Sequence, residues 1–225
     1  MMVSELISQV AVRLGDPRMS RTTQADLLAF YNEALEELTL GWKVLEEDAT
    51  ADIVAGERRY LYPEECVQLR RARYNPTPST DDYGYDLKED FWEEHKARTN
   101  YFVEAGEPRH YCVRASFFEL RPTPETAVVD GLFVSYWKLG TPIVNTADAL
   151  LTAEVELPAT FRKYLREYTT IFAKEKSGRY QEASADRAAL VESLDRVAGR
   201  LEDKSDDRRA QMRTRPVSSR FGRQN

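Results

Sequence analysis

The sequence predicts an α+β protein in which a β-rich segment is inserted between two pairs of helices. Apolar residues recur at helical spacing near both ends of the chain, whereas residues 44–157 alternate between apolar and polar side chains and hold most of the prolines. The last 18 residues contain six arginines and no acidic residue. We therefore expect a four-helix bundle from the N- and C-terminal helix pairs, an inserted antiparallel β domain, and an extended basic C-terminal arm.

The first predicted helix covers the opening residues of the chain. Leu6, Val10 and Leu14 fall on one face at helical spacing, and Ser4 is the expected N-cap. Gly15, with a proline two residues later, is the expected stop. No basic leader precedes the apolar residues, so this stretch indicates an amphipathic helix rather than a signal peptide.

The second predicted helix covers residues 23–40. Thr23 followed by Asp26 is a variant of the capping box that begins many helices, and Gly41 is expected to end this one. The residues expected to face the core are Leu27, Leu28, Tyr31, Ala34, Leu35 and Leu38.

The β domain is expected to contain six strands. They are predicted at residues 53–54, 60–61, 67–74, 111–113, 117–120 and 128–139. Residues 75–79 contain two prolines and are expected to form a loop. Residues 87–98 have helical rather than strand spacing, so a short helix is expected inside the β domain.

Helical spacing returns after the β domain. Pro158 suits the first turn of a helix, and Ser177 with Gly178 is expected to end it. A last helix is expected over residues 180–201. These elements divide the chain into a helical bundle (1–43 and 158–203), a β-rich domain (44–157) and an extended arm (204–225).

The charge of the chain is divided unevenly. Its 32 lysines and arginines stand against 38 aspartates and glutamates, which gives a net charge of −6. Without the six arginines of residues 208–225, 26 basic and 38 acidic residues leave a body of −12 beside a C-terminal segment of +6. This pattern is typical of an acidic folded body with an interaction arm.

The C-terminal segment is the main candidate for a binding site. It has few apolar residues, no helical stripe, and a proline and a glycine that interrupt it, so it is not expected to fold alone. The segment can order on a partner protein, grip DNA through arginine–phosphate contacts, or remain a solvated terminus. The candidate binding residues are Arg208, Arg209, Arg213, Arg215, Arg220, Phe221 and Arg223.

The sequence contains no arrangement that is typical of an enzyme. It has neither a G-x-G-x-x-G nor a G-x-x-x-x-G-K-[ST] motif, which excludes the usual phosphate-binding loops. His95 lies in a charged segment typical of a solvated helix face. His110 and Cys112 share one face of a predicted strand, but no nucleophile elbow or orienting carboxylate accompanies them. No catalytic residue and no cofactor is expected, and Cys66 and Cys112 are expected to be reduced thiols.

Metal and membrane binding are not indicated either. Two pairs of adjacent acids, Asp81–Asp82 and Glu89–Asp90, do not match the spacing of a calcium-binding loop, so no metal site is expected. No apolar run approaches the roughly 20 residues that span a bilayer. We expect a protein that is made in the cytoplasm and does not bind a membrane.

Several short motifs and the order of the elements resemble a known family. In chain order the motifs are Gln24-Ala25-Asp26-Leu27-Leu28-Ala29-Phe30-Tyr31-Asn32-Glu33-Ala34, Gly56-x-x-x-Tyr60-x-x-Pro63, Gly106-x-Pro108-x-x-Tyr111, Leu120-Arg121-Pro122-x-Pro124 and Leu157-Pro158. The chain resembles the head-to-tail adaptor (connector) proteins of tailed bacteriophages and is similar to the tail gatekeeper proteins of short-tailed phages. The resemblance covers nearly the whole chain.

The resemblance implies a structural virion protein rather than an enzyme. Such adaptors form a ring, here expected to contain twelve copies, between the portal protein and the tail or nozzle proteins in the neck of the virion. Genomic DNA passes through the ring without specific binding, which suits an acidic body. The C-terminal arm docks on the portal, so its arginines and Phe221 are the expected docking residues. The alternative is a DNA-binding accessory protein that uses the arginine-rich tail.

Overall fold

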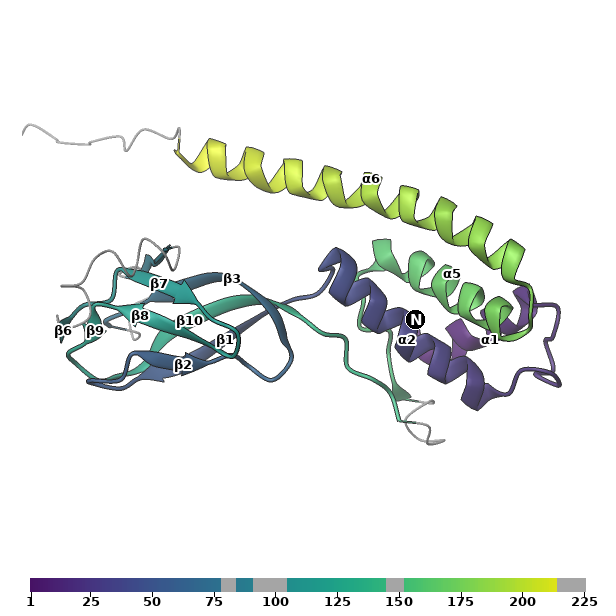
Figure 1. The fold of residues 1–225 in the computed structure, drawn as a ribbon, viewed down its shortest axis with the longest axis horizontal. Helices are drawn as coiled ribbons and strands as arrows, with labels where there is room; N and C mark the ends of the chain where they lie inside the picture. Colours follow the sequence, from purple (N-terminus) through teal and green to yellow (C-terminus); the bar gives the residue numbers. More distant parts are fainter. Residues whose placement is uncertain (78–83, 91–104, 145–151, 214–225) are drawn as a thin grey trace, which may run out of the picture.

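The computed structural model confirms an α+β protein, with four helices and mainly antiparallel sheets among the residues that it describes (Figure 1). It describes residues 1–77, 84–90, 105–144 and 152–213, with side chains as far as residue 197. The helices gather at one end of an elongated molecule, which we call the helical lobe, and the strands at the other, the β lobe (Figure 1). Each lobe has a hydrophobic core of its own.

The helices of the helical lobe bury one common core. They are α1 (Val3–Arg13), α2 (Gln24–Trp42), α5 (Ala159–Lys176) and α6 (Tyr180–Arg213). α5 contacts each of the other three. Leu6 and Val10 of α1 and the residues of α2 that were expected to face the core are buried in it. Residues from both connections to the β lobe join it, namely Val44, Leu45, Val155 and Leu157.

The start of α1 differs from the prediction and its end agrees with it. Met2, not Ser4, occupies the N-cap position. The N–H group of Val3 donates to the carbonyl of Ala153 at 3.0 Å, so a backbone partner from a distant segment replaces the expected side-chain cap. Gly15 follows the helix with a φ of +75°, a conformation that glycine adopts without strain.

α2 begins as predicted and ends later than predicted. The Thr23 side chain accepts from the backbone N–H of Asp26, and both halves of the capping box are present. The helix runs through Gly41 to Trp42, so the prediction that Gly41 ends it is wrong. Lys43 takes the left-handed conformation at the C-cap, with φ of 50°, that a glycine usually supplies.

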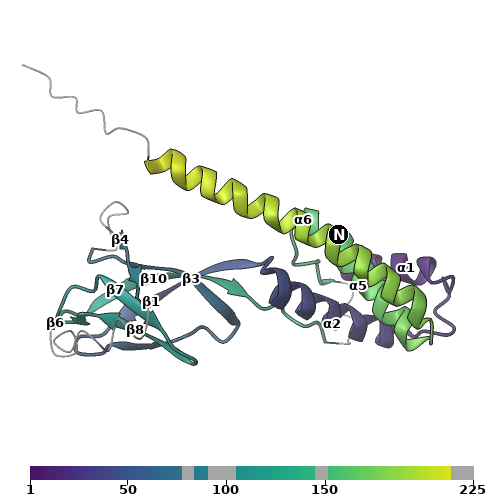
Figure 2. The ribbon, with the colours of Figure 1, turned by 45° about the horizontal axis from the view of Figure 1, so that its top comes forward.

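α5 and α6 are separated at Ser177 and Gly178, as predicted, and Pro158 immediately precedes α5. α6 continues to Arg213, so the prediction of an extended arm from residue 204 is wrong for residues 204–213. These residues lack an apolar stripe, but they contain no glycine or proline and include several strong helix formers. α6 therefore extends beyond the helical lobe (Figures 1 and 2).

The β lobe is built from two four-stranded sheets and one short strand pair. The strands are β1 (Glu46–Ile53), β2 (Arg59–Leu61), β3 (Cys66–Tyr74), β4 (Tyr85–Asp86), β5 (Lys88–Glu89), β6 (Ala105–Gly106), β7 (His110–Val113), β8 (Phe117–Arg121), β9 (Thr123–Pro124) and β10 (Val128–Lys138). The sheets have the orders β1-β10-β3-β4 and β2-β8-β7-β5, and β6 pairs with β9. The pairings are antiparallel except for β5–β7 and β6–β9, which are parallel.

Five of the six predicted strands coincide with β2, β3, β7, β8 and β10, and the sixth is corrected. β1 starts at residue 46 rather than 53, with Ala49, Ala51 and Ile53 turned toward the core and acidic or polar residues at most of the exposed positions. The small size of the inward alanines and the many acids conceal the alternation in the sequence.

The predicted short helix over residues 87–98 is wrong where the structure describes it. Lys88 and Glu89 form a strand that pairs in parallel with β7. The N–H of Lys88 donates to the carbonyl of Arg109, so the local helical spacing yields to a pairing with a distant strand. Residues 91–98 lie outside the described residues.

Candidate interaction surfaces

The residues that could have supported enzyme chemistry have structural roles in the β lobe. The Nδ1 atom of His110 lies 3.1 Å from Asp90 Oδ1. The buried Cys112 thiol donates to the carbonyl of Val113 at 3.8 Å. Burial raises the pKa of the Cys66 and Cys112 thiols, which favours the protonated form and disfavours nucleophilic attack.

The acid pairs named from the sequence do not assemble a described metal site. Glu89 Oε2 accepts a hydrogen bond from the Tyr111 hydroxyl at 3.3 Å, and Asp90 pairs with His110. Asp81 and Asp82 lie outside the described residues. In the described part of the chain, no group of three or more His, Cys, Asp and Glu residues is placed to hold a metal ion. None of the described helices is long and apolar enough to cross a membrane.

A partly buried ion-pair network that the sequence did not predict joins β2 to β8. Arg121 is 2% exposed, and its Nη2 atom lies 3.3 Å from Glu119 Oε2, while Arg59 Nε lies 3.2 Å from Glu119 Oε1. Burial alone would raise the pKa of Glu119, but the hydrogen bonds from the two arginines lower it and keep the carboxylate charged. A glutamate inside the apolar run of β8 is the sequence signal for this network.

The two lobes meet at Lys138, the last residue of β10. Its Nζ atom lies 3.1 Å from Glu47 on β1, 3.0 Å from Glu65 before β3, and 3.1 Å from Glu156 before α5. Burial alone would lower the pKa of Lys138, but hydrogen bonds with the three carboxylates raise it, so the ammonium stays charged. One cation thus joins three segments that are distant in sequence.

The chain then returns to the helical lobe along α2. Gly140 N donates to Thr39 Oγ1 at 3.2 Å, and Asn32 exchanges two hydrogen bonds of 3.0 Å with the backbone of Ile143. A Cβ atom on Gly140 would lie 2.4 Å from Leu35 Cγ, so the backbone approaches α2 more closely than any side chain allows. These contacts and Lys138 together fix the connection between the lobes.

The predicted docking residues begin on α6 and continue past its end. Three of them belong to the last turns of the helix, whose side chains are not described: Arg208, Arg209 and Arg213. The other four lie outside the described residues: Arg215, Arg220, Phe221 and Arg223. Arg208, Arg209 and Arg213 therefore lie on the part of α6 that extends beyond the helical lobe (Figures 1 and 2).

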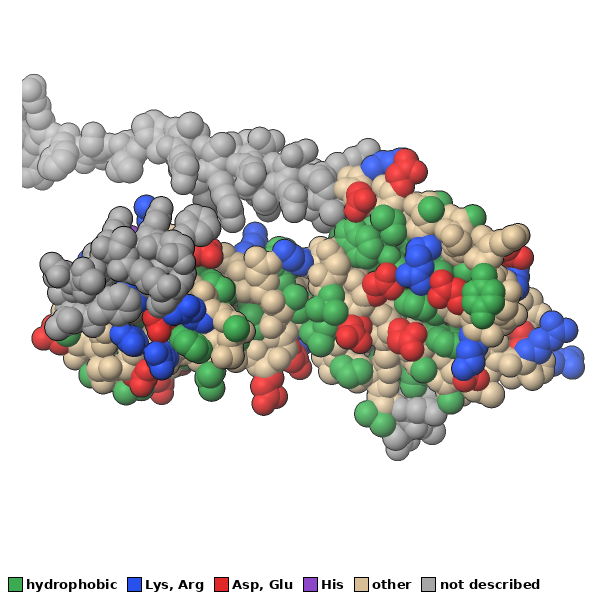
Figure 3. Space-filling model, viewed as in Figure 1, with side chains coloured by type: hydrophobic (Ala, Val, Ile, Leu, Met, Phe, Trp, Pro, Cys, Tyr) green, Lys and Arg blue, Asp and Glu red, His purple; other side chains and the backbone are tan. Residues whose placement is uncertain are grey.

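Most of the negative charge of the body belongs to the segment that contains the β lobe. Residues 44–157 hold 22 acidic and 12 basic residues, a net charge of −10 out of the −12 of residues 1–207. Acidic side chains project along the lower edge of the β lobe in Figure 3. The excess of acidic residues and the arginine-rich segment thus belong to different parts of the chain. Residues 44–157 suit a basic partner, and residues 208–225 suit an acidic one.

Comparison with known proteins assigns the family. A family model described as SU10 adaptor protein matches residues 1–220. No curated protein matches the chain. The match spans the motifs between Gln24 and Pro158, and the family implies association with portal and tail proteins in the neck of the virion. The chain belongs to the SU10 adaptor protein family and is a structural head-to-tail adaptor of a tailed phage.

Proposed function

We propose that this adaptor forms a ring of twelve copies beneath the portal, joins the capsid to the tail, and lets the genome pass. The helices of residues 1–43 and 158–203 form a four-helix bundle that makes the body of the ring. Residues 44–157 form a separate domain that faces the portal, the tail or both. The observation that carries the proposal is the division into an acidic body of −12 and a +6 segment that starts on α6.

An acidic body suits a passage for DNA. Duplex DNA carries one negative charge per roughly 1.7 Å of its axis, so it adheres to basic surfaces and is repelled by acidic ones. The net charge of −10 in residues 44–157 favours a channel along which DNA moves without specific binding.

An arginine-rich segment suits docking on the portal. Arginine forms paired, charge-assisted hydrogen bonds with carboxylates, and each such bond contributes more than a neutral one. α6 fixes the direction in which the segment leaves the body. The twelve residues after Arg213 can then reach up to roughly 40 Å when extended.

Binding to the purified portal ring tests the docking segment. Deletion of residues 214–225 leaves α6 intact, and we expect it to raise the Kd for the portal at least about tenfold, as the loss of one or two charged hydrogen bonds predicts. The variant R208Q/R209Q should weaken binding in the same direction. The matched control R18Q/R21Q changes two exposed arginines between α1 and α2 and should bind normally.

Unchanged portal binding by both variants would remove the segment from the mechanism. The alternative, DNA binding by the same arginines, predicts a different result. In that case the affinity of the protein for duplex DNA would fall steeply as salt is added. The slope of log affinity against log salt concentration would be close to the number of arginines engaged. Absence of duplex binding at low salt would exclude that alternative.

A further inference from the structure

We propose that neighbouring copies join through the outer face of α2 on one copy and a groove between α1 and α6 on the next. The inference rests on the proposed ring and names the surfaces that build it. The occupant of the groove is therefore a second copy of this chain.

The groove is an open side of the helical lobe. α1, α2 and α6 pack around α5, and α5 forms the floor of the space between α1 and α6. The groove has a volume of about 380 Å³. It is lined by Arg13 from α1, by Thr170, Ile171 and Lys174 from α5, and by Leu190 and Ser193 from α6.

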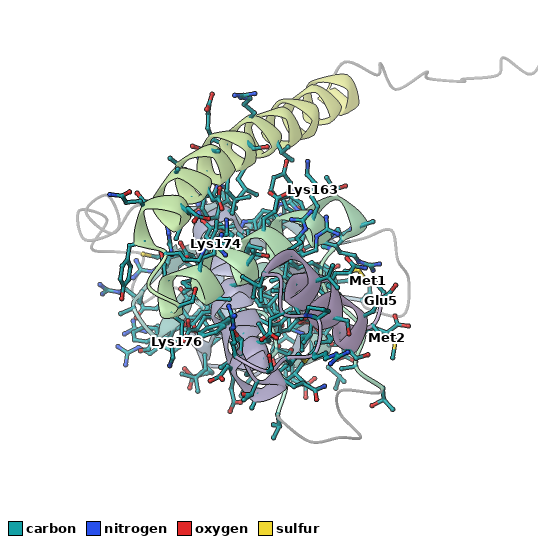
Figure 4. All side chains as sticks on the ribbon, turned by 90° about the vertical axis from the view of Figure 1, so that its right-hand side faces the viewer. Met1, Met2, Glu5, Lys163, Lys174 and Lys176 are labelled. Atoms are coloured by element: carbon teal, nitrogen blue, oxygen red, sulfur yellow. The ribbon has the colours of Figure 1, made fainter. Side chains whose placement is uncertain are left out.

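The groove and α2 lie on different sides of α5. Thr170, Ile171 and Lys174 recur at spacings of one turn or less and share one face of the helix. Another face carries Tyr168, whose ring centroid is 5.9 Å from that of Trp42 on α2. In the end-on view of Figure 4, Lys163 lies between α6 and α1 at the upper right. α2 lies below α5 (Figure 1). Because the groove and α2 are on different sides of α5, one copy can contact one neighbour through each surface.

α2 presents an exposed face opposite its buried one. The residues of this outer face recur every three or four positions and are all exposed: Ala25, Ala29, Glu33, Glu36 and Leu40. The alanines permit a close approach, and Leu40 remains 47% exposed although it is a large apolar side chain. The face follows most of a 19-residue helix, which is about 28 Å long.

The charge of α2 is entirely negative. The helix contains four acidic residues and no basic residue, whereas α5 contains five basic residues and two acidic ones. Glu37 pairs with Arg187 of α6 at 3.1 Å. Glu33 and Glu36, on the outer face, make no ion pair with any side chain that the structure describes.

The groove side carries the cations that match these two acids. Arg13 and Lys163 have no carboxylate partner among the described side chains, and Lys163 Nζ lies 4.4 Å from the centroid of the Tyr164 ring. Arg166 donates to the neutral Gln9 Oε1 at 2.8 Å. Lys163 lies one helical turn before Glu167, and Arg166 lies one turn before Thr170; both Glu167 and Thr170 line the groove.

Acidic residues also line the groove and offset the cations of its lining. Asp186 is neutralised by Lys174, with an Nζ–Oδ2 distance of 2.6 Å. Glu167 carries one further negative charge. The lining is therefore neutral, because Arg13 and Lys174 offset Glu167 and Asp186. Lys163 and Arg166, which lie beside the groove on α5, add the two positive charges that Glu33 and Glu36 of a second copy balance.

Because the two surfaces differ, the contact is head-to-tail rather than two-fold. Each copy offers one outer face and one groove, so the same contact repeats from copy to copy and closes a ring when the rotation permits. Opposite charges select this pairing and disfavour contact between two α2 faces.

Charge reversal tests the interface in the full chain, mixed with the purified portal ring and followed by sedimentation. We expect E33R/E36R to lose the ring, R13E/K163E to lose it as well, and the four substitutions together to restore it. The matched control E125R makes the same kind of change on an exposed residue of the β lobe and should assemble normally.

Disulfide trapping tests the same contact without reversing any charge. In a C66S/C112S background, E33C or E36C is mixed with R13C or K163C and oxidised. At least one mixture should give covalent dimers made of one copy of each kind. Dimers formed by E33C or E36C alone would overturn the head-to-tail contact.

The outcomes separate this interface from the ring itself. A wild-type chain that stays monomeric on the portal would overturn the proposed ring. A wild-type ring that tolerates both charge reversals would overturn this interface and leave the ring standing. A four-substitution variant that misfolds leaves the decision to the trapping experiment, where no mixed dimer in any of the four mixtures contradicts the proposal.

Discussion

At the scale of single residues, Asp16 organises the turn between α1 and α2. Its Oδ1 atom accepts from the backbone N–H and the hydroxyl of Ser20 at 2.9 and 2.8 Å. Its Oδ2 atom accepts from the N–H groups of Arg21 and Thr22 at 2.7 and 3.1 Å. The bonds from Arg21 and then Ser20 hold the pKa of Asp16 well below its usual range.

The Asp16→Asn variant should be less stable than the wild type, and most clearly at neutral pH. The amide replaces one acceptor with a donor that faces backbone N–H groups. Because folding lowers the pKa of Asp16, the stabilisation is present above the pKa of the unfolded chain, about 3.9, and is lost as pH falls through the folded value. The difference in melting temperature between the wild type and Asp16→Asn should therefore shrink as the pH is lowered from 7 to 2. Parallel profiles would contradict this role, and Glu125→Gln serves as the control.

At the scale of elements, the ends of α2 show which boundary signals are local. The capping box at Thr23 needs only residues within one turn, so it was predictable from the sequence. The end at Lys43 was not, because a lysine adopts the left-handed conformation only where the structure around it requires that turn.

Thr23→Ala should reduce the free energy of unfolding by about 1 kcal/mol. The substitution removes the oxygen that accepts from Asp26 N at 3.2 Å and the hydroxyl that donates to Asp26 Oδ2 at 2.8 Å. Urea unfolding followed by circular dichroism measures the loss. Thr23→Ser should restore most of it, and Thr22→Ala, one residue earlier, should have little effect. Equal losses at residues 22 and 23 would contradict a specific cap.

β1 and α6 are both longer than the sequence predicted, for different physical reasons. β1 is stabilised by pairing with β10, which is about 80 residues away in the chain, so weak local strand signals suffice. α6 continues through residues 204–213 because helix propensity alone favours it, although no apolar stripe marks it in the sequence. Tertiary pairing extended the first element, and intrinsic propensity extended the second.

At the scale of the whole molecule, Lys138→Met tests the junction between the lobes. Methionine keeps much of the side-chain volume but leaves three carboxylates without their shared cation. We expect a loss of about 1–2 kcal/mol, reduced from the value for a buried pair because the carboxylates are partly exposed. Chemical unfolding measures it.

The pH dependence of that loss has a defined sign. Folding raises the pKa of Lys138, so its contribution is complete below the unfolded value of about 10.4 and disappears as pH rises through the folded value. Lys138→Arg should retain most of the stability, and Lys88→Met is the control on an exposed lysine. A Lys138→Met variant as stable as Lys88→Met would show that the junction does not depend on this cation.

The sequence by itself determined the α+β class, the positions of most helices and five strands, the division of charge and the family. Each of these depends on local periodicity, composition or short motifs, which do not require contacts between residues that are distant in the sequence. Only the tertiary structure decided the groove between α1 and α6 and the junction at Lys138. These features join residues such as Glu47, Lys138 and Glu156, which share no local pattern and meet only because the packed lobes bring them together.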